Sequence, residues 1–153
     1  MMKLASEVIQ TLAGRTLATA ESCTGGMIGQ ALTAVAGASA VYKGGVISYT
    51  NEVKENVLGV SGQLLKEFGA VSAPVAEAMA IGARRKLNAD FAVSVTGLAG
   101  PSGDEYGNPV GTVFIGFASE DRSEAIACYF EGDRAAVRRQ AAEAALVLIL
   151  ENA

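Results

Sequence analysis

The hydrophobic positions of the chain recur with a helical period in some stretches and form short apolar runs in others. Leu4, Val8, Ile9 and Leu12 share one helical face and predict a first helix, which Gly14 can end. Further helices are predicted from the glycine pair at 25–26 to about residue 35, and over 50–58, 63–68, 72–87 and from 133 onward. The residues predicted to cap three of these helices are Thr50, Ser72 and Asp133.

Five short runs between these helices have the composition of strands. They cover residues 16–20, 44–49, 91–95, 111–118 and 124–130. The run 91–95 is almost wholly apolar, as in a strand buried on both faces. The last two runs lie close together and predict an antiparallel hairpin. Strands that alternate with helices favour a layered α/β fold, with helices on both faces of a mixed, mostly parallel sheet. The composition is even throughout, so residues 1–153 are interpreted as one domain.

The absence of histidine from the chain limits the chemistry that it can perform. It excludes Ser-His-Asp and Cys-His mechanisms and every His-ligated zinc site. A general base here must be a carboxylate, a lysine, a tyrosine or a water molecule.

The net charge and the hydropathy of the chain indicate which classes of partner and which location to expect. The net charge is −4, whereas nucleic-acid binders usually carry a basic surface, so a nucleic-acid role is not expected. Cys23 and Cys128 are too few for a disulfide framework. The longest apolar run, 144–150, is far shorter than the ~20 residues that span a bilayer, and no secretory signal is visible. We therefore expect a soluble cytoplasmic protein without a membrane partner.

Three predicted strands lead into polar or glycine-rich turns. The turns are ESCTGG at 21–26, TNEVK at 50–54 and TGLAGPSG at 96–103. In open α/β sheets, ligands bind at the carboxyl ends of the strands. If the three strands are parallel neighbours, their turns meet at one cleft.

The first turn places hydroxyl groups and backbone N–H groups at the start of a helix, where an anion or an oxyanion is stabilised. Ser22 is the candidate nucleophile, and Thr24, Gly25 and Gly26 are candidate oxyanion or substrate-binding residues. The alternative is an ordinary strand-to-helix turn capped by a hydroxyl. Cys23 is interpreted as a small buried residue, because no histidine can activate its thiol.

The second turn offers Tyr49 and Lys54 as a candidate catalytic pair. A lysine has a reference pKa of about 10.4, so it acts as a base near pH 7 only if its pKa falls by about three units, or roughly 4 kcal/mol. The alternative is a solvated lysine paired with Glu55 or another carboxylate.

The third turn and the last helix offer residues for substrate binding. Thr96 and Gly97 begin a long turn that could bind a ligand or simply cross the surface. Arg134 and Arg138 lie four residues apart on one helical face and could bind a phosphate, or they could belong to a solvated surface.

Several segments together resemble one known family. The runs AESCTGG, YKGGVISYTNEVKENVLGV, VTGLAGPSG and FEGDRAAVRRQA occur in order and resemble the C-terminal domain of the competence/damage-inducible protein CinA, whose stand-alone form is a nicotinamide-nucleotide amidohydrolase. The resemblance implies a three-layer α/β/α fold. It also implies hydrolysis of the carboxamide of nicotinamide mononucleotide to nicotinate mononucleotide and ammonia, with no metal and no cofactor.

The resemblance also assigns roles to residues. It implies Ser22, Lys54 and Tyr49 as the catalytic set, with Thr96 and the arginines after 132–133 as binding positions. The family loop more often has a glycine where this chain has Asp104. The additional N-terminal domain of larger CinA proteins is not expected here.

Two other functions stay open, namely a non-catalytic nucleotide- or phosphate-binding regulatory module and an amidase for another small amide. A homo-oligomer is expected, although the apolar last helix would suit a core equally well.

Overall fold

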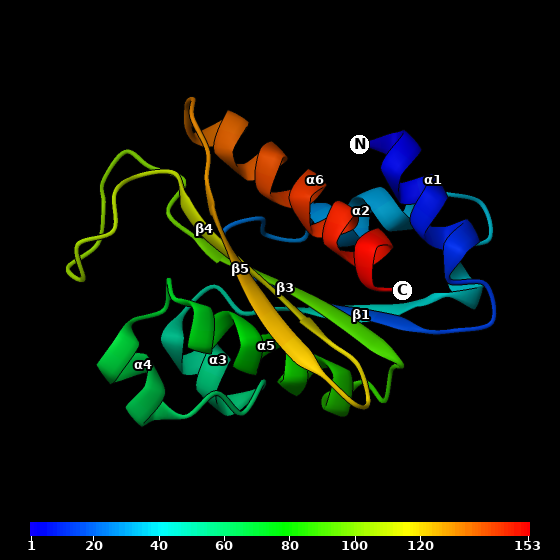
Figure 1. Cartoon of the computed structure of the whole chain (residues 1–153), viewed down its shortest axis with the longest axis horizontal. Helices are drawn as coiled ribbons and strands as arrows, with labels where there is room; N and C mark the ends of the chain where they lie inside the picture. The colour runs from blue at the N-terminus through cyan, green and yellow to red at the C-terminus, as the bar shows by residue number, and fades with distance from the viewer.

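A five-stranded mixed sheet lies at the centre of the computed structural model, which describes all 153 residues (Figure 1). The strands are β1 (Leu17–Glu21), β2 (Tyr42–Ile47), β3 (Phe91–Gly97), β4 (Thr112–Ala118) and β5 (Ser123–Tyr129). Their order in the sheet is β2-β1-β3-β4-β5. The strand β1 pairs in parallel with β2 and β3, whereas β4 is antiparallel to β3 and β5. Only β4 therefore runs against the other strands, and the predicted mixed, mostly parallel sheet with its C-terminal hairpin is confirmed.

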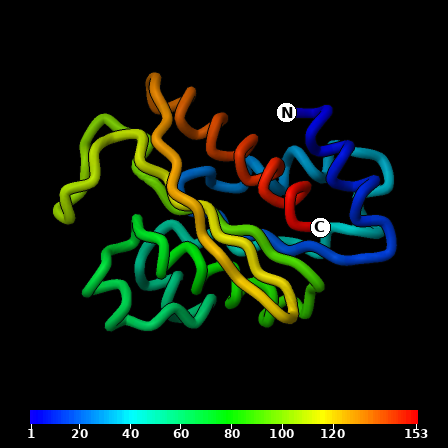
Figure 2. The backbone as a smooth tube through the Cα atoms, viewed as in Figure 1, coloured from blue at the N-terminus to red at the C-terminus, as the bar shows by residue number.

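Helices cover both faces of the sheet and complete the three layers of the predicted α/β/α fold (Figure 1). On one face lie α1 (Met2–Thr11), α2 (Met27–Thr33) and α6 (Arg134–Asn152). On the other face lie α3 (Asn51–Asn56), α4 (Gly62–Phe68) and α5 (Ala73–Lys86). A short 3₁₀ turn, η1 (Ala38–Ala40), precedes β2 and was not predicted. The backbone trace in Figure 2 shows the long connection between β3 and β4 extending beyond one end of the sheet.

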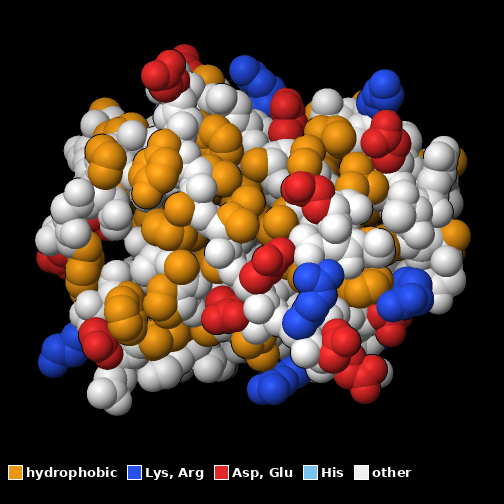
Figure 3. Space-filling model, in the orientation of Figure 1, with side chains coloured by type: hydrophobic (Ala, Val, Ile, Leu, Met, Phe, Trp, Pro, Cys, Tyr) orange, Lys and Arg blue, Asp and Glu red, His pale blue; other side chains and the backbone are white.

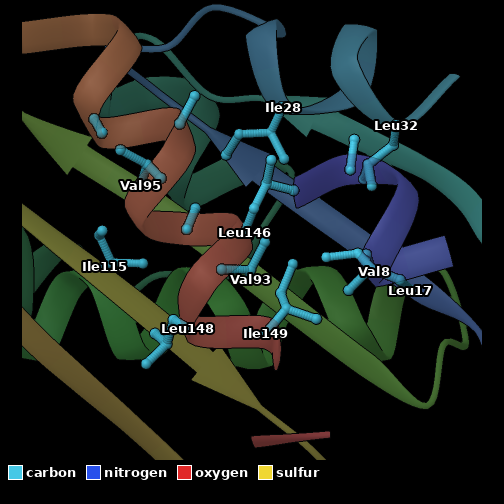
Figure 4. Close-up of a cluster of buried hydrophobic side chains, with 14 of the residues drawn as sticks. Val8, Leu17, Ile28, Leu32, Val93, Val95, Ile115, Leu146, Leu148 and Ile149 are labelled. Carbon is cyan, nitrogen blue, oxygen red and sulfur yellow. The ribbon is translucent and has the colours of Figure 1, made fainter. Parts of the chain in front are cut away.

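The larger hydrophobic core lies between the sheet and the layer formed by α1, α2 and α6. In Figure 4, Leu146 and Ile149 of α6 lie over Val93 and Val95 of β3, with Ile28 of α2 beside them. All five side chains are fully buried. The apolar face of α6, which the sequence allowed to be either a core or a dimer surface, therefore lies in the core of this chain.

On the opposite face, α5 packs directly on β4 and β3. A glycine, Gly116, faces the helix there, and a Cβ atom added to it would lie far too close to the backbone carbonyl oxygen of Ala76. The same carbonyl accepts a hydrogen bond from the Ser94 hydroxyl of β3. Helix and sheet therefore approach more closely here than any side chain on Gly116 would allow.

The end of β2 differs from the prediction in a way that affects the site. The strand β2 ends at Ile47, so Tyr49 lies beyond the strand that was expected to end on it. The chain turns after Ser48 because Thr50 caps α3 by accepting a hydrogen bond from the Val53 N–H. Asp133 caps α6 as predicted. By contrast, Ser72 stands at the N-cap position of α5 but its hydroxyl donates to the Gly69 carbonyl instead.

The surface carries charges of both signs. On the face shown in Figure 3, Lys and Arg side chains are scattered among acidic ones and form no continuous basic patch. None of the helices combines the length and the hydropathy that crossing a bilayer requires.

We expect Gly116→Ala to lower the free energy of unfolding by about 1–3 kcal/mol, because the new methyl group forces α5 away from the sheet. Urea unfolding measures this change. Gly62→Ala is the matched control, because its Cβ would meet only the flexible Glu55 side chain, at 2.8 Å, in the first turn of α4. A Gly116→Ala variant as stable as that control would contradict the close approach of helix and strand.

Candidate active site

A cavity of about 280 Å³ lies at the carboxyl ends of β1, β2 and β3. Its lining includes Ser22 and Cys23 from the first turn, Tyr49 and Lys54 from the second, residues 96–100 and Ser102 from the third, and Arg134 from α6. The three turns predicted to meet at one cleft therefore do so, because β1 pairs in parallel with both of its neighbours.

The centre of the cavity is a contact between Lys54 and Ser22. The Lys54 ammonium nitrogen Nζ lies 3.0 Å from Ser22 Oγ, although the two residues are 32 positions apart in sequence. Lys54 is only 1% exposed and Ser22 is 7% exposed. Both side chains are thus held in a largely dry environment at the floor of the cavity.

The hydrogen-bond partners of Lys54 include no carboxylate. Its Nζ donates to the carbonyl oxygens of Ser48, at 2.6 Å, and of Tyr49, at 3.4 Å. Burial lowers the pKa of Lys54 from 10.5 to about 8, and the nearby Cys23 offsets only part of this effect. A neutral amine has two N–H bonds for the two carbonyls and one lone pair, which the Ser22 hydroxyl can then approach with its proton. The surroundings of Lys54 thus fit a general base for Ser22.

A buried carboxylate, Glu21, shapes the turn that carries Ser22. Its Oε1 accepts hydrogen bonds from the Thr24 hydroxyl at 2.8 Å and from the backbone N–H groups of Gly26 and Ile28 at 3.2 and 2.9 Å. Its Oε2 accepts from the Gly29 N–H at 3.0 Å. Glu21 thereby pairs N–H groups that the start of α2 would otherwise leave without partners. No role for Glu21 was predicted from the sequence, in which its only signal is its position as a carboxylate just before a glycine-rich helix start.

Some backbone N–H groups of this turn donate to other residues of the protein, and others do not. The Gly25 N–H donates to the Ser22 carbonyl and the Gly26 N–H to Glu21, so neither can bind an oxyanion, contrary to the expectation for these two glycines. The N–H groups of Cys23 and Thr24 donate to no other residue of the protein. Of the residues from Cys23 to Gly26, only Cys23 lines the cavity. The free N–H next to Ser22 is therefore that of Cys23.

The thiol of Cys23 is not set up as a nucleophile. Burial raises its pKa to about 11. A hydrogen bond from the Cys23 backbone N–H, and then the positive charges of Arg138, Lys54 and Arg134, offset only part of that increase. The thiol therefore remains protonated near neutral pH, in agreement with its interpretation as a buried structural residue.

The two arginines that were expected to face one anion have different partners. Arg134 lines the cavity, and its Nη1 donates to the Gly100 carbonyl at 2.6 Å. Arg138 lies outside the lining, and its Nε and Nη2 donate to the carbonyls of Cys23 and Thr24 at 2.9 and 3.2 Å. Arg138 therefore braces the Ser22 turn, and Arg134 is the guanidinium at the mouth of the cavity.

Tyr49 contributes to the site through two different groups. Its backbone carbonyl is a partner of Lys54, whereas its side chain is 60% exposed at the mouth. The Tyr49 hydroxyl accepts a hydrogen bond from Arg134 Nη2 at 3.3 Å. The side chain thus contacts Arg134, and the contact with Lys54 is made by the main chain.

The end of β3 and the turn that follows it form one wall of the cavity. Thr96 is buried and donates from Oγ1 to the Ala70 carbonyl at 2.8 Å. Gly97 also lines the cavity, and a Cβ there would lie 2.6 Å from Val113 Cγ2. Ala70 and Val71, which precede α5, complete this wall, and the sequence analysis did not identify them.

Comparison with known proteins places the chain in a family. A model of the CinA C-terminal domain matches residues 1–153. A CinA-like protein of Anaeromyxobacter dehalogenans is 54% identical over 136 residues, which make up 89% of this chain and 33% of that protein. The chain thus spans about a third of the length of such relatives. The nicotinamide-nucleotide amidohydrolase PncC of Escherichia coli is 48% identical over 151 residues, with 95% of this chain and 90% of PncC covered.

Solved structures agree with this placement. A CinA superfamily protein from Escherichia coli superposes with a TM-score of 0.96 at 36% identity, with 98% of this chain and 88% of that chain covered. A competence/damage-inducible protein from Agrobacterium tumefaciens superposes with a TM-score of 0.94 at 39% identity, with 98% and 93% covered. The chain therefore belongs to the CinA C-terminal domain family.

Proposed function

We propose that this protein hydrolyses the carboxamide of nicotinamide mononucleotide to nicotinate mononucleotide and ammonia. The observation that carries this proposal is the buried Lys54 amine, 3.0 Å from Ser22 Oγ and without a carboxylate partner. The likeness to PncC of Escherichia coli, a nicotinamide-nucleotide amidohydrolase, supports the choice of substrate.

In the first step, Ser22 Oγ attacks the carboxamide carbon while Lys54 Nζ accepts the hydroxyl proton. The negative charge that develops on the carboxamide oxygen is stabilised by the free N–H of Cys23, the residue after the nucleophile. Arg138 holds the carbonyl of the same residue and so helps to fix the direction of that N–H.

In the second step, the C–N bond breaks and the proton on Lys54 passes to the leaving nitrogen, which departs as ammonia. The expected relay through the Tyr49 hydroxyl is not part of this step, because that hydroxyl makes no hydrogen bond with Lys54 and instead accepts one from Arg134 at the mouth of the cavity. Water then attacks the acyl-serine ester with Lys54 as base, which releases nicotinate mononucleotide and restores Ser22.

The two sides of the cavity suit the two ends of the nucleotide. The apolar side chains of Ala70, Val71 and Leu98 form a wall for the nicotinamide ring. Arg134 at the mouth uses two of its five N–H donors on Gly100 and Tyr49, and the others remain for the phosphate.

We expect Ser22→Ala and Lys54→Met to lower ammonia release from nicotinamide mononucleotide by about 10³-fold or more, because each removes one member of the nucleophile–base pair. A coupled ammonia assay measures this loss. Lys3→Met is the matched control, because Lys3 is exposed on α1, and its activity should equal that of the wild type.

Three results would contradict the proposal. Near wild-type turnover in either site variant would refute the mechanism. Binding of nicotinamide mononucleotide by the wild type without any ammonia would indicate a non-catalytic nucleotide-binding module. Faster turnover of another small amide in a substrate panel would change the substrate.

The pH dependence of kcat/KM should follow the deprotonation of Lys54. Since its pKa lies near 8, about a tenth of the free enzyme has a neutral lysine at pH 7. We expect kcat/KM to rise about tenfold per pH unit below pH 8 and to level off above it. A profile that is flat from pH 6 to 9 would rule out Lys54 as the base.

The lowered pKa of Lys54 should also appear in stability, independently of any substrate. The folded pKa of about 8 lies below the unfolded value near 10.5, so between these values the unfolded chain binds more protons and stability rises with pH. Relative to Lys54→Met, the wild type should gain about 1 kcal/mol in free energy of unfolding from pH 7 to pH 9. Urea unfolding at both values measures this gain, and Lys3→Met should show none relative to the wild type.

A further inference from the structure

Two side chains hold the wall of the cavity that Ala70 and Val71 form. One comes from the end of β3, and the other comes from the connection between β3 and β4. Thr96 Oγ1 donates to the Ala70 carbonyl at 2.8 Å, and Asn108 Nδ2 donates to the Val71 carbonyl at 3.1 Å. Thr96 lines the cavity itself, whereas Asn108 lies in the long connection between β3 and β4 and does not line it. The position of Val71 therefore depends on how that connection is folded.

Asp104 determines the fold of the connection. Its Oδ2 accepts a hydrogen bond from Asn108 Nδ2 at 2.8 Å. Its Oδ1 accepts from the backbone N–H groups of Tyr106 and Asn108 at 3.1 and 2.9 Å. Burial alone would raise the pKa of Asp104, but the hydrogen bonds from Asn108 and Tyr106 outweigh it and the pKa is lowered. One carboxylate thus holds both the backbone of the loop and the amide that reaches Val71.

A second contact fastens the same loop to the helical layer. The Tyr106 hydroxyl donates to the Lys66 carbonyl at the end of α4 at 2.8 Å. Its ring lies so close to Gly69 that a Cβ there would come within 2.6 Å of Cδ2, and Gly69 has a φ of +79°. Gly69 leads directly into Ala70, so the loop braces this wall segment from both ends. Figure 2 shows the loop, in yellow-green, beyond the end of the sheet.

We propose that Asp104 is a positioning residue which, through Asn108, fixes the Ala70–Val71 wall and so sets the affinity of the site for the nicotinamide ring. The inference rests on the proposed function. Asp104 touches no reacting atom and lies outside the cavity lining, so its loss acts on substrate binding and leaves the Ser22–Lys54 pair intact. A wall that is already ordered before binding avoids the entropic cost of ordering it around the substrate.

The variant Asp104→Asn tests this role without changing the size of the side chain, because an amide has one acceptor oxygen where a carboxylate has two. In Asp104→Asn, an NH₂ donor replaces one of the two acceptor oxygens, and the other oxygen remains an acceptor. If the new NH₂ faces Asn108 Nδ2, two donors oppose each other. If the Asn108 amide flips to correct this, its oxygen faces the Val71 carbonyl and that hydrogen bond is lost. If the new NH₂ instead faces the backbone N–H groups of Tyr106 and Asn108, those two hydrogen bonds are lost and the loop that carries Asn108 loosens. In either orientation the isosteric variant weakens the hold on Val71, as the complete truncation Asp104→Gly does.

The experiment compares Asp104→Asn and Asp104→Gly with the matched control Glu105→Gln, which removes one negative charge from the next residue, whose side chain makes no hydrogen bond. We expect KM for nicotinamide mononucleotide and the Kd for nicotinate mononucleotide to rise about tenfold in both Asp104 variants. We expect kcat to change less than twofold. Hydrogen exchange of the Tyr106 and Asn108 amides should accelerate in these variants and not in Glu105→Gln.

Three outcomes would overturn the inference. They are a KM like that of the control, a fall in kcat at unchanged KM, and an equal rise in KM in Glu105→Gln, which would indicate a charge effect. If the wild type releases no ammonia, the proposed function fails. The inference is then decided by the Kd of nicotinamide mononucleotide alone, where an unchanged Kd in Asp104→Asn, or no binding by the wild type, overturns it.

Discussion

The burial of one amine determines how the rest of this site is built. An isolated charge in a protein interior is costly, so a buried lysine without a carboxylate partner shifts toward its neutral form. Lys54 avoids a complete loss of solvation because the carbonyls of Ser48 and Tyr49 replace water as acceptors. Both carbonyls are available only because β2 ends at Ile47 and the chain turns before α3. A carboxylate in the same place would hold Lys54 charged and would remove the lone pair that Ser22 needs.

The turn that carries Ser22 depends on elements from distant parts of the chain. Glu21, just before Ser22, accepts hydrogen bonds from backbone N–H groups at the start of α2. Arg138 of α6 donates hydrogen bonds to the carbonyls of Cys23 and Thr24. Since α6 also fills the larger core with Leu146 and Ile149, correct docking of that helix both stabilises the fold and orients the turn. The packing of α6 against the sheet and the orientation of the Ser22 turn are therefore linked.

The sequence predicted well those features that depend on local pattern and parallel topology. The strand-then-turn segments at 21–26, 50–54 and 96–103 were expected to meet, and they do because three parallel neighbours end at one edge. The pairing of Lys54 with Ser22 was implied by the family resemblance, because the residue pattern alone left a solvated lysine as an alternative. In the structure Lys54 Nζ lies 3.0 Å from Ser22 Oγ. The roles that these residues take in a reaction are a proposal.

The features that the sequence did not predict depend on hydrogen bonds between distant residues. Whether a backbone N–H is free cannot be read from a motif, and at Gly26 the competing acceptor is the buried Glu21 side chain. Arg138 was grouped with Arg134 by helical spacing, but its partners lie 115 and 114 residues away. Helical spacing identifies the face on which a side chain lies, and the partner on that face comes from tertiary packing.

A lysine, unlike a histidine, must be buried before it can act as a base near neutral pH. The ordinary pKa of histidine, about 6.5, leaves it mostly neutral at pH 7 without any burial. Lysine reaches a useful neutral fraction only in a dry site, so its burial and its basicity are linked. With a pKa of about 8, Lys54 is a stronger base than an ordinary imidazole once it is deprotonated, although a smaller fraction of molecules is in that form at neutral pH. In the proposed mechanism the same burial would strengthen the interaction of the Cys23 N–H with an oxyanion, so one structural condition, the burial of the floor of the cavity, would serve both the base and the oxyanion donor.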